Sequence, residues 1–258
     1  MGFADRLRTA LEPGWADFPG RAGFAAWDLE EREPVLFGAE RVVHPASTIK
    51  VLIMLAALRE VQEGRLALDA EVELPADRVG GSGVLKELPS VRQMSLVDLI
   101  TLMIVISDNA ATNAVVEAVG FAAINDRAAE FGCQGTQVQR LLMRVEDPGT
   151  NTTCALDQAR ILDRLATGAA LSPELTRHAL GVLARQQVRD RLPAQLPDGA
   201  RCWNKTGELS DVRHDVALIG DDRPRAVVAV LVDELALAAP RVCARIAELG
   251  LRVFQSLG

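Results

Sequence analysis

Ser47 and Lys50 are the first residues in the sequence whose types and spacing could do chemistry. They lie three residues apart in HPASTIKVLIMLAAL, residues 44–58, at the start of an apolar run. The simplest interpretation is a serine that caps a helix, followed by a lysine in solvent. Yet the apolar run predicts a helix that is buried on nearly every side. A buried lysine loses hydration and its pKa falls, so Lys50 could accept a proton from the Ser47 hydroxyl.

Two further motifs contain residue types that take part in acyl transfer. SDN, residues 107–109, links two predicted helices, and KTG, residues 205–207, closes a predicted strand. Taken singly, each is explained by a capping turn or a strand-end turn. SxxK arises by chance in roughly one chain of this composition in ten, and SDN or KTG in roughly one in a hundred each. All three in this order therefore indicate one joint site, which would use two of the chain's three lysines.

The composition argues against several kinds of partner. A chain of 258 residues can form one large domain or two closely packed ones, and its apolar content is sufficient for a core. The net charge of −7 disfavours nucleic-acid binding, because phosphate contacts require clustered Lys and Arg. No apolar run reaches the roughly 18 residues of a membrane-spanning helix. We therefore expect a monomer that acts on a small molecule, with no nucleic-acid partner and no membrane span.

The N-terminal residues and the cysteines bear on the compartment. MGFADRLRTALEPGWADF lacks the basic start, the unbroken apolar stretch and the cleavage site of a secretory signal. We therefore expect a cytoplasmic protein, or a periplasmic or secreted one if a signal has been removed. The four cysteines are widely spread without CxxC spacing, so we expect buried free thiols and neither a metal site nor a disulfide framework.

Hydrophobic periodicity predicts strands near both ends of the chain and helices between them. After a first helix over residues 3–12, two runs form a predicted hairpin over residues 23–30 and 33–40. Helices are predicted over residues 48–63, 96–106, 110–119, 122–131, 156–165 and 173–185. Further strands are predicted over residues 201–207, 215–220 and 225–234, before a closing helix over residues 240–257.

This order predicts an α+β fold in which a helical lobe is inserted into an antiparallel sheet. We expect residues 1–44 and 198–258 to form the α/β lobe, in which terminal helices flank the sheet. Residues 45–197 would form the all-helical lobe. The three motifs then come from both lobes, so the site would lie in the cleft between them.

At these motifs the chain resembles the penicillin-recognising serine enzymes, and specifically the class A β-lactamases and their short relatives. The resemblance covers most of the chain. It includes ASTIK with its following helix, EGRLALD, GGSGVL, SDNAATN, KTG and the final strand and helix. It implies a β-lactamase and transpeptidase-like fold, no cofactor, and hydrolysis of the β-lactam amide bond through an acyl-enzyme, a route to antibiotic resistance.

The resemblance also implies roles for the motif residues. Ser47 would attack the amide carbonyl, and Lys50 would accept or relay the proton. Ser107 would pass a proton to the leaving nitrogen. Asn109 would hydrogen-bond both Lys50 and the amide side chain of the substrate.

The KTG segment would bind the substrate. By the same resemblance, Lys205 and Thr206 would hold its carboxylate, and Gly207 would let the strand backbone approach closely. The backbone N–H groups of Ser47 and Glu208 would form the oxyanion hole. Arg213 could help to bind the carboxylate, although a solvated position or a structural pair with Asp215 would explain it equally well.

Release of the acyl group depends on a glutamate in class A β-lactamases. RVE, residues 144–146, resembles that family's RxE, which makes Glu146 the candidate for activating water, and a surface glutamate is the simpler alternative. The family continues Glu-x-x-Leu-Asn, whereas this chain continues EDPGTNTT in a shortened omega loop. The alternative function is therefore a related serine peptidase or esterase, or a penicillin-binding protein, that β-lactams acylate and that deacylates poorly.

The remaining candidates are weaker. The sequence contains no Tyr, which excludes the Tyr-x-Asn motif of class C enzymes. His44, His178 and His214 lack the spacing of metal ligands and are expected to be structural. GGSG, residues 80–83, has no P-loop context and is expected to be a loop beside the site. A non-catalytic binding protein with this fold is the third functional hypothesis.

Overall fold

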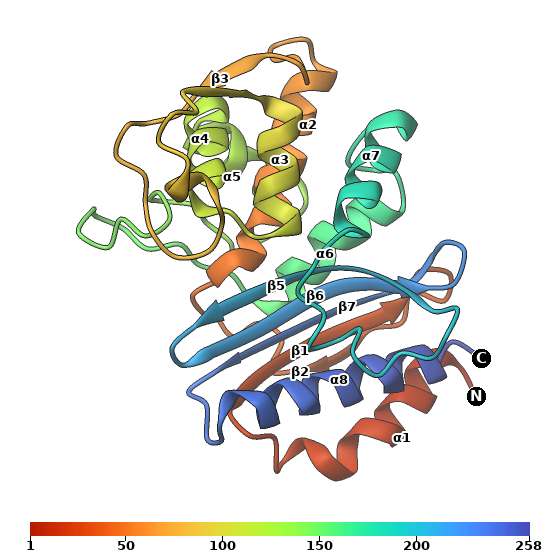
Figure 1. Cartoon of the computed structure of the whole chain (residues 1–258). Helices are drawn as coiled ribbons and strands as arrows, with labels where there is room; N and C mark the ends of the chain where they lie inside the picture. Colours follow the sequence, from red (N-terminus) through yellow and green to blue (C-terminus); the bar gives the residue numbers. More distant parts are fainter.

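A computed structural model describes residues 1–258, and a five-stranded antiparallel sheet lies at its centre (Figure 1). The strand order is β2-β1-β7-β6-β5. The strands are β1 (Arg21–Asp28), β2 (Val35–Phe37), β5 (Arg201–Leu209), β6 (Val212–Gly220) and β7 (Pro224–Asp233). In the middle of the sheet, β1 pairs with β7 over its whole length, from Arg21 opposite Asp233 to Asp28 opposite Ala226. The predicted sheet with strands from both parts of the chain is confirmed.

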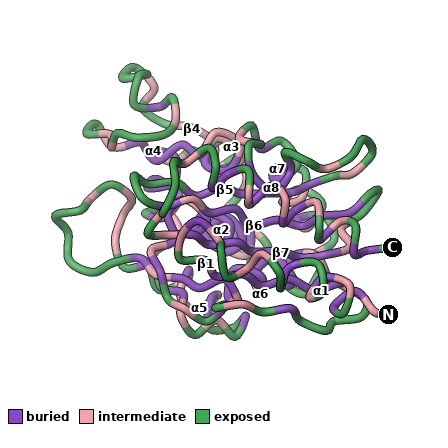
Figure 2. The backbone as a smooth tube through the Cα atoms, turned by 90° about the horizontal axis from the view of Figure 1, so that it is seen from below, coloured by how far each residue is buried: buried purple, intermediate pink, exposed green.

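Both faces of the sheet are buried, because alternate side chains along each strand enter two different hydrophobic cores. On β7, Val228 and Val230 pack into the core beneath α1 (Phe3–Trp15) and α8 (Ala239–Gln255). Their neighbours Val227 and Ala229 point the other way, into the larger core under the helical block. Figure 2 shows the result, with buried central strands and exposed loops around the edge of the molecule.

The helical block is formed by the part of the sequence between β2 and β5. Its helices are the short 3-10 turn η1 (Ala46–Ile49), α2 (Lys50–Gln62), the 3-10 turn η2 (Leu85–Glu87), α3 (Leu96–Val105), α4 (Asn109–Val119), α5 (Phe121–Glu130), α6 (Ala155–Ala166) and α7 (Pro173–Leu183). Every α-helix has a predicted counterpart whose ends differ by up to about three residues, as expected for helix boundaries.

The short ribbon of β3 (Glu71–Glu73) and β4 (Gln93–Ser95) has no counterpart among the predicted elements. Three mostly polar residues per strand are too few to produce an alternating pattern.

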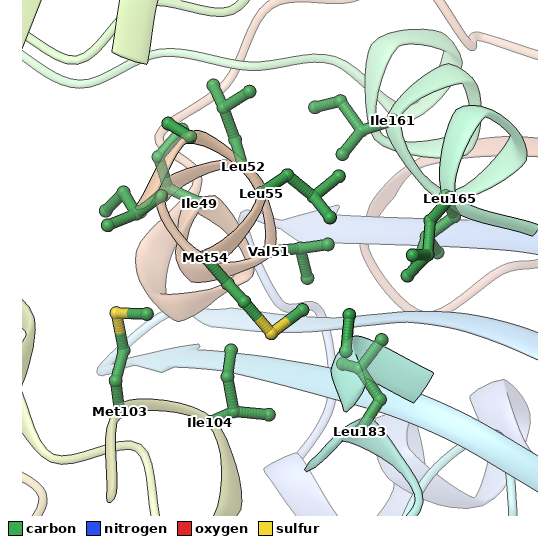
Figure 3. Packing of buried hydrophobic residues seen from close by; sticks show 14 of the residues in the cluster. Ile49, Val51, Leu52, Met54, Leu55, Met103, Ile104, Ile161, Leu165 and Leu183 are labelled. Carbon is green, nitrogen blue, oxygen red and sulfur yellow. The ribbon is translucent and has the colours of Figure 1, made fainter. Parts of the chain in front are cut away.

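Helix α2 runs through the middle of the larger core. All its residues from Lys50 to Leu58 are buried, as the unbroken apolar run predicts. Figure 3 shows Met54 and Leu55 of this helix surrounded by side chains of α3, α6 and α7. Burying one such side chain contributes about 1.5–3 kcal/mol, so α2 is held firmly in place. The start of this helix is therefore a rigid support for Lys50.

The helices and the sheet share this core. It contains Trp27 and Val216 from the sheet together with Ile100 and Ile161 from the helices. The division into lobes at residues 44/45 and 197/198 stays a prediction.

No helix of the structure has both the length and the apolar character required to cross a membrane. The four cysteines are free thiols, of which Cys133 is half-buried and the other three are buried.

Asp108 connects the SDN turn to the neighbouring loop. Its carboxylate accepts hydrogen bonds from the backbone N–H groups of Val84 (2.7 Å), Leu85 (2.9 Å) and Ala111 (2.9 Å). The last of these bonds caps α4, and the other two hold the loop that contains GGSG. Gly83 has a φ of +109°, and a Cβ there would lie 2.3 Å from the Asp108 carboxyl. Only glycine allows this close approach.

We predict that Asp108→Ala lowers the free energy of unfolding by about 3 kcal/mol, because a helix cap and two buried hydrogen bonds to a charged group are lost together. Urea unfolding followed by circular dichroism measures the change. Ser95→Ala is the matched control, since the Ser95 hydroxyl caps only α3; its cost should be about 1 kcal/mol. Equal costs for the two variants would show that Asp108 does not hold the loop.

Candidate active site

Ser47 lies in η1, one turn before α2, and is half-buried. The N-cap residues of η1 and α2 are Pro45 and Ile49, so the simple interpretation of Ser47 as a helix cap is wrong. The preceding residue, Ala46, has a φ of +46°, in the left-handed region that residues with a Cβ rarely adopt. Its N–H donates to His44 Nδ1 at 3.0 Å, which helps to fix the turn. Backbone strain of this kind is frequent next to reacting groups.

Lys50 is completely buried and its amine is held by the SDN turn. Lys50 Nζ donates to the Ser107 carbonyl oxygen (2.8 Å), to Ser107 Oγ (3.0 Å) and to Asn109 Oδ1 (2.9 Å). Ser107 has a φ of +59°, so this turn too has a left-handed residue. The predicted contact between Asn109 and Lys50 is confirmed. No hydrogen bond joins Lys50 Nζ to Ser47 Oγ in this structure.

The surroundings of Lys50 favour its neutral form. Burial lowers the pKa of Lys50 well below its usual value, and the nearby charge of Lys205 lowers it further. The charge of Asp108 acts in the opposite direction and is the weaker effect. The amine can therefore act as a base at a much lower pH than a lysine in solvent.

Lys205, on the edge strand β5, is also completely buried. Its Nζ donates to the carbonyl oxygen of Thr206 at 3.0 Å. Burial lowers the pKa of Lys205 to about 7, although the charge of Asp215 opposes this effect. Asp215 is itself buried; its carboxylate accepts hydrogen bonds from Asn204 Nδ2 (3.0 Å) and the Leu192 N–H (3.0 Å). Burial raises the pKa of Asp215 to about 6.

Gly207 brings β5 against the turn that contains Ser47. A Cβ at Gly207 would lie 3.1 Å from the carbonyl oxygen of Pro45 and 3.2 Å from the Cβ of Ala46. A side chain at this position would push the strand away from η1, so the close packing of these two segments requires glycine.

Two adjoining cavities open on Ser47. One, of about 380 Å³, has an apolar wall formed by Leu141, Leu142, Met143 and Val145. The other, of about 500 Å³, is more polar and is lined by Ser107, Thr206, Ser210 and Arg213, among others. Ser82 of the GGSG loop lines both cavities, so this loop lies beside the site as predicted.

The Glu208 side chain lines both cavities and forms ion pairs. Arg191 Nη2 donates to Glu208 Oε2 at 2.5 Å, and Arg213 Nη2 lies 3.9 Å from Glu208 Oε1. Arg213 makes no ion pair with Asp215, so that alternative is wrong; the Asp215 carboxylate is directed to Asn204 instead. Arg191 is 1% exposed and is absent from the sequence predictions, because nothing in RDRLPAQ signals a buried arginine.

The structure places Glu146 away from Ser47 and Lys50 and outside both cavities. The Glu146 side chain is 65% exposed, its only ionic partner is Arg144 at 3.9 Å, and it lines neither cavity. The loop before Glu146 is fixed at Leu142 and not at Glu146. Asn113 bonds both the N–H (2.8 Å) and the carbonyl oxygen (3.1 Å) of Leu142. This clamp places leucine at the cavity wall and leaves Glu146 in solvent.

His214 occupies a structural position, whereas His44 lines the apolar cavity. His214 is completely buried; its Nδ1 accepts from the Val232 N–H (2.9 Å), so its Nε2 donates to the His44 carbonyl oxygen (3.0 Å). Burial lowers the pKa of His214 to about 4, which keeps this ring neutral. No group of three His, Cys, Asp or Glu side chains is placed to hold a metal ion.

Comparison with known proteins agrees with the geometry. The sequence profile described as the "Beta-lactamase enzyme family" matches residues 3–257. A curated β-lactamase of Proteus vulgaris is 27% identical over 169 residues, which span 66% of this chain but only 55% of that protein.

Solved structures extend the likeness to the whole chain. A β-lactamase from Sphaerobacter thermophilus is 32% identical, with a TM-score of 0.86 over 100% of this chain and 96% of that one. A mutant of PBP-A, solved as an acyl-enzyme complex with penicillin G, is 27% identical, with a TM-score of 0.87 over 99% and 97% of the two chains. An ancestral class A β-lactamase is 28% identical, with a TM-score of 0.87 over 96% and 98%.

The resemblance seen in the sequence motifs and the predicted fold class are therefore confirmed, and this chain belongs to the β-lactamase enzyme family.

Proposed function

We propose that this protein is a serine hydrolase that opens the amide bond of β-lactams through an acyl-enzyme on Ser47. One observation carries the proposal: a fully buried lysine, Lys50, one turn after a cavity-lining serine, bonded to Ser107 and Asn109. A neutral amine with these neighbours has no evident structural use, whereas acyl transfer requires a base and a proton relay beside a hydroxyl.

Acylation would begin when neutral Lys50 takes the proton of Ser47 as its Oγ attacks the carbonyl carbon. The carbon–oxygen bond forms, and the carbonyl electron pair moves onto oxygen. When the carbonyl re-forms, the carbon–nitrogen bond breaks, and Ser107 donates its proton to the departing nitrogen. Lys50 then returns a proton to Ser107, to which it is already hydrogen-bonded at 3.0 Å. The last transfer thus follows a hydrogen bond that is already present, whereas the first requires Ser47 Oγ to approach Lys50 Nζ.

The backbone would stabilise the negative oxygen. We assign this role to the N–H groups of Ser47 and Glu208. Support comes from the position of β5 at the sheet edge, which leaves alternate N–H groups without a strand partner, and from the packing of Gly207 against Ala46. Such donors are fixed before the reaction begins, which is why they lower the barrier effectively.

The two cavities suit the two halves of a penicillin. The polar cavity would take the ring carboxylate, with Thr206 and Arg213 in its wall. Lys205, which is fully buried and lines neither cavity, would supply positive charge next to Thr206. The apolar cavity would take the acyl side chain against Leu142 and Met143. PBP-A, which is similar over nearly its whole length, forms an acyl-enzyme with penicillin G in its mutant form.

Hydrolysis of the acyl-enzyme would be the slow step. A water molecule that attacks the ester needs a base, and the apolar wall of residues 141–145 supplies no carboxylate. Lys50 is the remaining candidate for this base. The family match favours a hydrolase over the penicillin-binding alternative, so we expect turnover, limited by deacylation.

The first prediction tests the nucleophile. Ser47→Ala should abolish hydrolysis of a chromogenic cephalosporin and the mass adduct formed with penicillin G, because no other hydroxyl in the cavities lies one turn before a buried lysine. Ser210→Ala, in the wall of the polar cavity, is the control and should keep the hydrolysis rate and the adduct yield within about threefold of wild type. An undiminished rate in Ser47→Ala would refute the proposal.

The second prediction concerns pH. The charged form of Lys205 is protonated, so its positive charge is lost as pH rises through about 7. The second-order rate of acylation by a substrate with a carboxylate should therefore fall between pH 7 and 9. Lys205→Gln should lower the acylation rate by about 10–100-fold at pH 6. It should also remove the decrease in rate between pH 7 and 9, because glutamine is uncharged over this whole pH range. Stopped-flow kinetics measure the acylation rates of the wild type and of Lys205→Gln. If the rate of Lys205→Gln decreases with pH as much as that of the wild type, another titrating group is responsible for the decrease.

The third prediction separates the two positions of the loop. Glu146→Gln should leave the lifetime of the penicillin G adduct unchanged within about twofold, because Glu146 faces solvent. Leu142→Glu should shorten it by at least about 100-fold, since a general base contributes about 10²–10⁴-fold and Asn113 fixes the backbone at residue 142. Intact mass against time gives both lifetimes. A longer lifetime in Glu146→Gln would restore Glu146 as the base.

A further inference from the structure

Glu208 is the only acidic residue among those that line the two cavities. It directly follows KTG, and the register of β5 and β6 places it opposite Arg213. Residues paired in this way have side chains on the same face of the sheet, within reach of each other. The Glu208 side chain is 58% exposed, so its carboxylate lies at the open side of the cleft.

Two guanidinium groups face this carboxylate. Arg191, which is buried, donates to Glu208 Oε2 at 2.5 Å, and its Nε and Nη1 atoms have no hydrogen-bond partner. A buried cation needs a counterion; besides Glu208, the carboxylate of Asp190 lies 3.7 Å from Arg191 Nε. Burial lowers the pKa of Arg191, but the charges of Asp190 and Asp215 outweigh this effect and raise the pKa, which favours the protonated form. Arg213 reaches the second oxygen of Glu208 at 3.9 Å, and its Nη1 is already bonded to the carbonyl oxygens of Leu209 and Val212.

Arg191, Arg213 and Glu208 together therefore form an anion site that the protein itself occupies. A carboxylate from a substrate that enters the polar cavity would meet Arg213 with its charge already neutralised, and it would be repelled by Glu208. Two carboxylates cannot share the same guanidinium without one of them losing its partner.

We propose that Glu208 is a specificity-determining residue whose side chain competes with the substrate carboxylate for Arg213. The proposal rests on the function proposed above, and it concerns only the Glu208 side chain, since the N–H assigned to the oxyanion hole is unaffected by substitution. Glu208 thus leaves Thr206 and the positive charge of Lys205 to hold the substrate carboxylate, and it reduces the advantage of acidic substrates over neutral ones.

The test compares a cephalosporin acid with its methyl ester, which differs only in the charge that Arg213 would bind. With Glu208→Gln, the second-order rate of acylation of Ser47 by the acid should rise about tenfold, the value of one charge-assisted hydrogen bond, while the rate with the ester changes by less than about twofold. Glu208→Gln/Arg213→Gln should lose the gain. Asp211→Asn, an exposed acid that lines neither cavity, should behave as wild type.

The outcomes are separable. If neither cephalosporin acylates the wild-type protein, the proposed function fails. If both do and Glu208→Gln changes the two rates equally, lowers the rate with the acid, or keeps its gain without Arg213, the role of Glu208 is overturned. If Glu208→Gln fails to fold because Arg191 loses its counterion, Glu208→Asp provides the test. Aspartate keeps the negative charge but has a shorter side chain. The ratio of the acylation rates with the acid and with the ester should then rise about two- to threefold. An unchanged ratio in Glu208→Asp then refutes the proposal.

Discussion

The burial of one amine is the constraint on which the rest of the structure depends. Removing a charged ammonium from water costs several kcal/mol unless acceptors replace the lost hydration or the group gives up its proton. Both conditions are met at Lys50, because three oxygen acceptors lie 2.8–3.0 Å from its Nζ and its neutral form is favoured. The left-handed backbone at Ser107 is part of this arrangement, because it lets the carbonyl and the hydroxyl of one residue face the same amine.

A second buried lysine complements the first. Lys205 stands on the edge strand, and its charge adds to burial in lowering the pKa of Lys50, so that below about pH 7, where Lys205 is protonated, it favours the neutral form of Lys50. A site that contains one neutral and one charged amine can remove a proton and bind an anion at the same time. The packing of Gly207 against Ala46 keeps the strand that carries Lys205 close to the turn that carries Ser47.

The sequence predicts those parts of the molecule that local pattern determines. The sheet and the helices of the block follow from periodicity, and the contact between Lys50 and Asn109 is implied by the resemblance of the motifs to the class A β-lactamases. Glu146 and Arg191 could not be placed in this way, because their positions depend on distant partners. Asn113 fixes the backbone of Leu142 from a neighbouring helix, and Arg191 is buried against a glutamate 17 residues away on β5. Neither contact leaves a periodic signal.

In the proposed mechanism, acylation and deacylation depend on different parts of the structure and could therefore change independently. The groups assigned to acylation lie on η1 and α2, on the capped turn before α4 and on β5, all of which are tied to the buried cores. The wall that faces the acyl group belongs to a loop held by a few side-chain amides, those of Asn113 and Asn151. Under this mechanism, a shift of such a loop would exchange a carboxylate for a leucine at the wall without moving the nucleophile. The fold would then fix how the acyl-enzyme forms, and the loop sequence would decide how long it lasts.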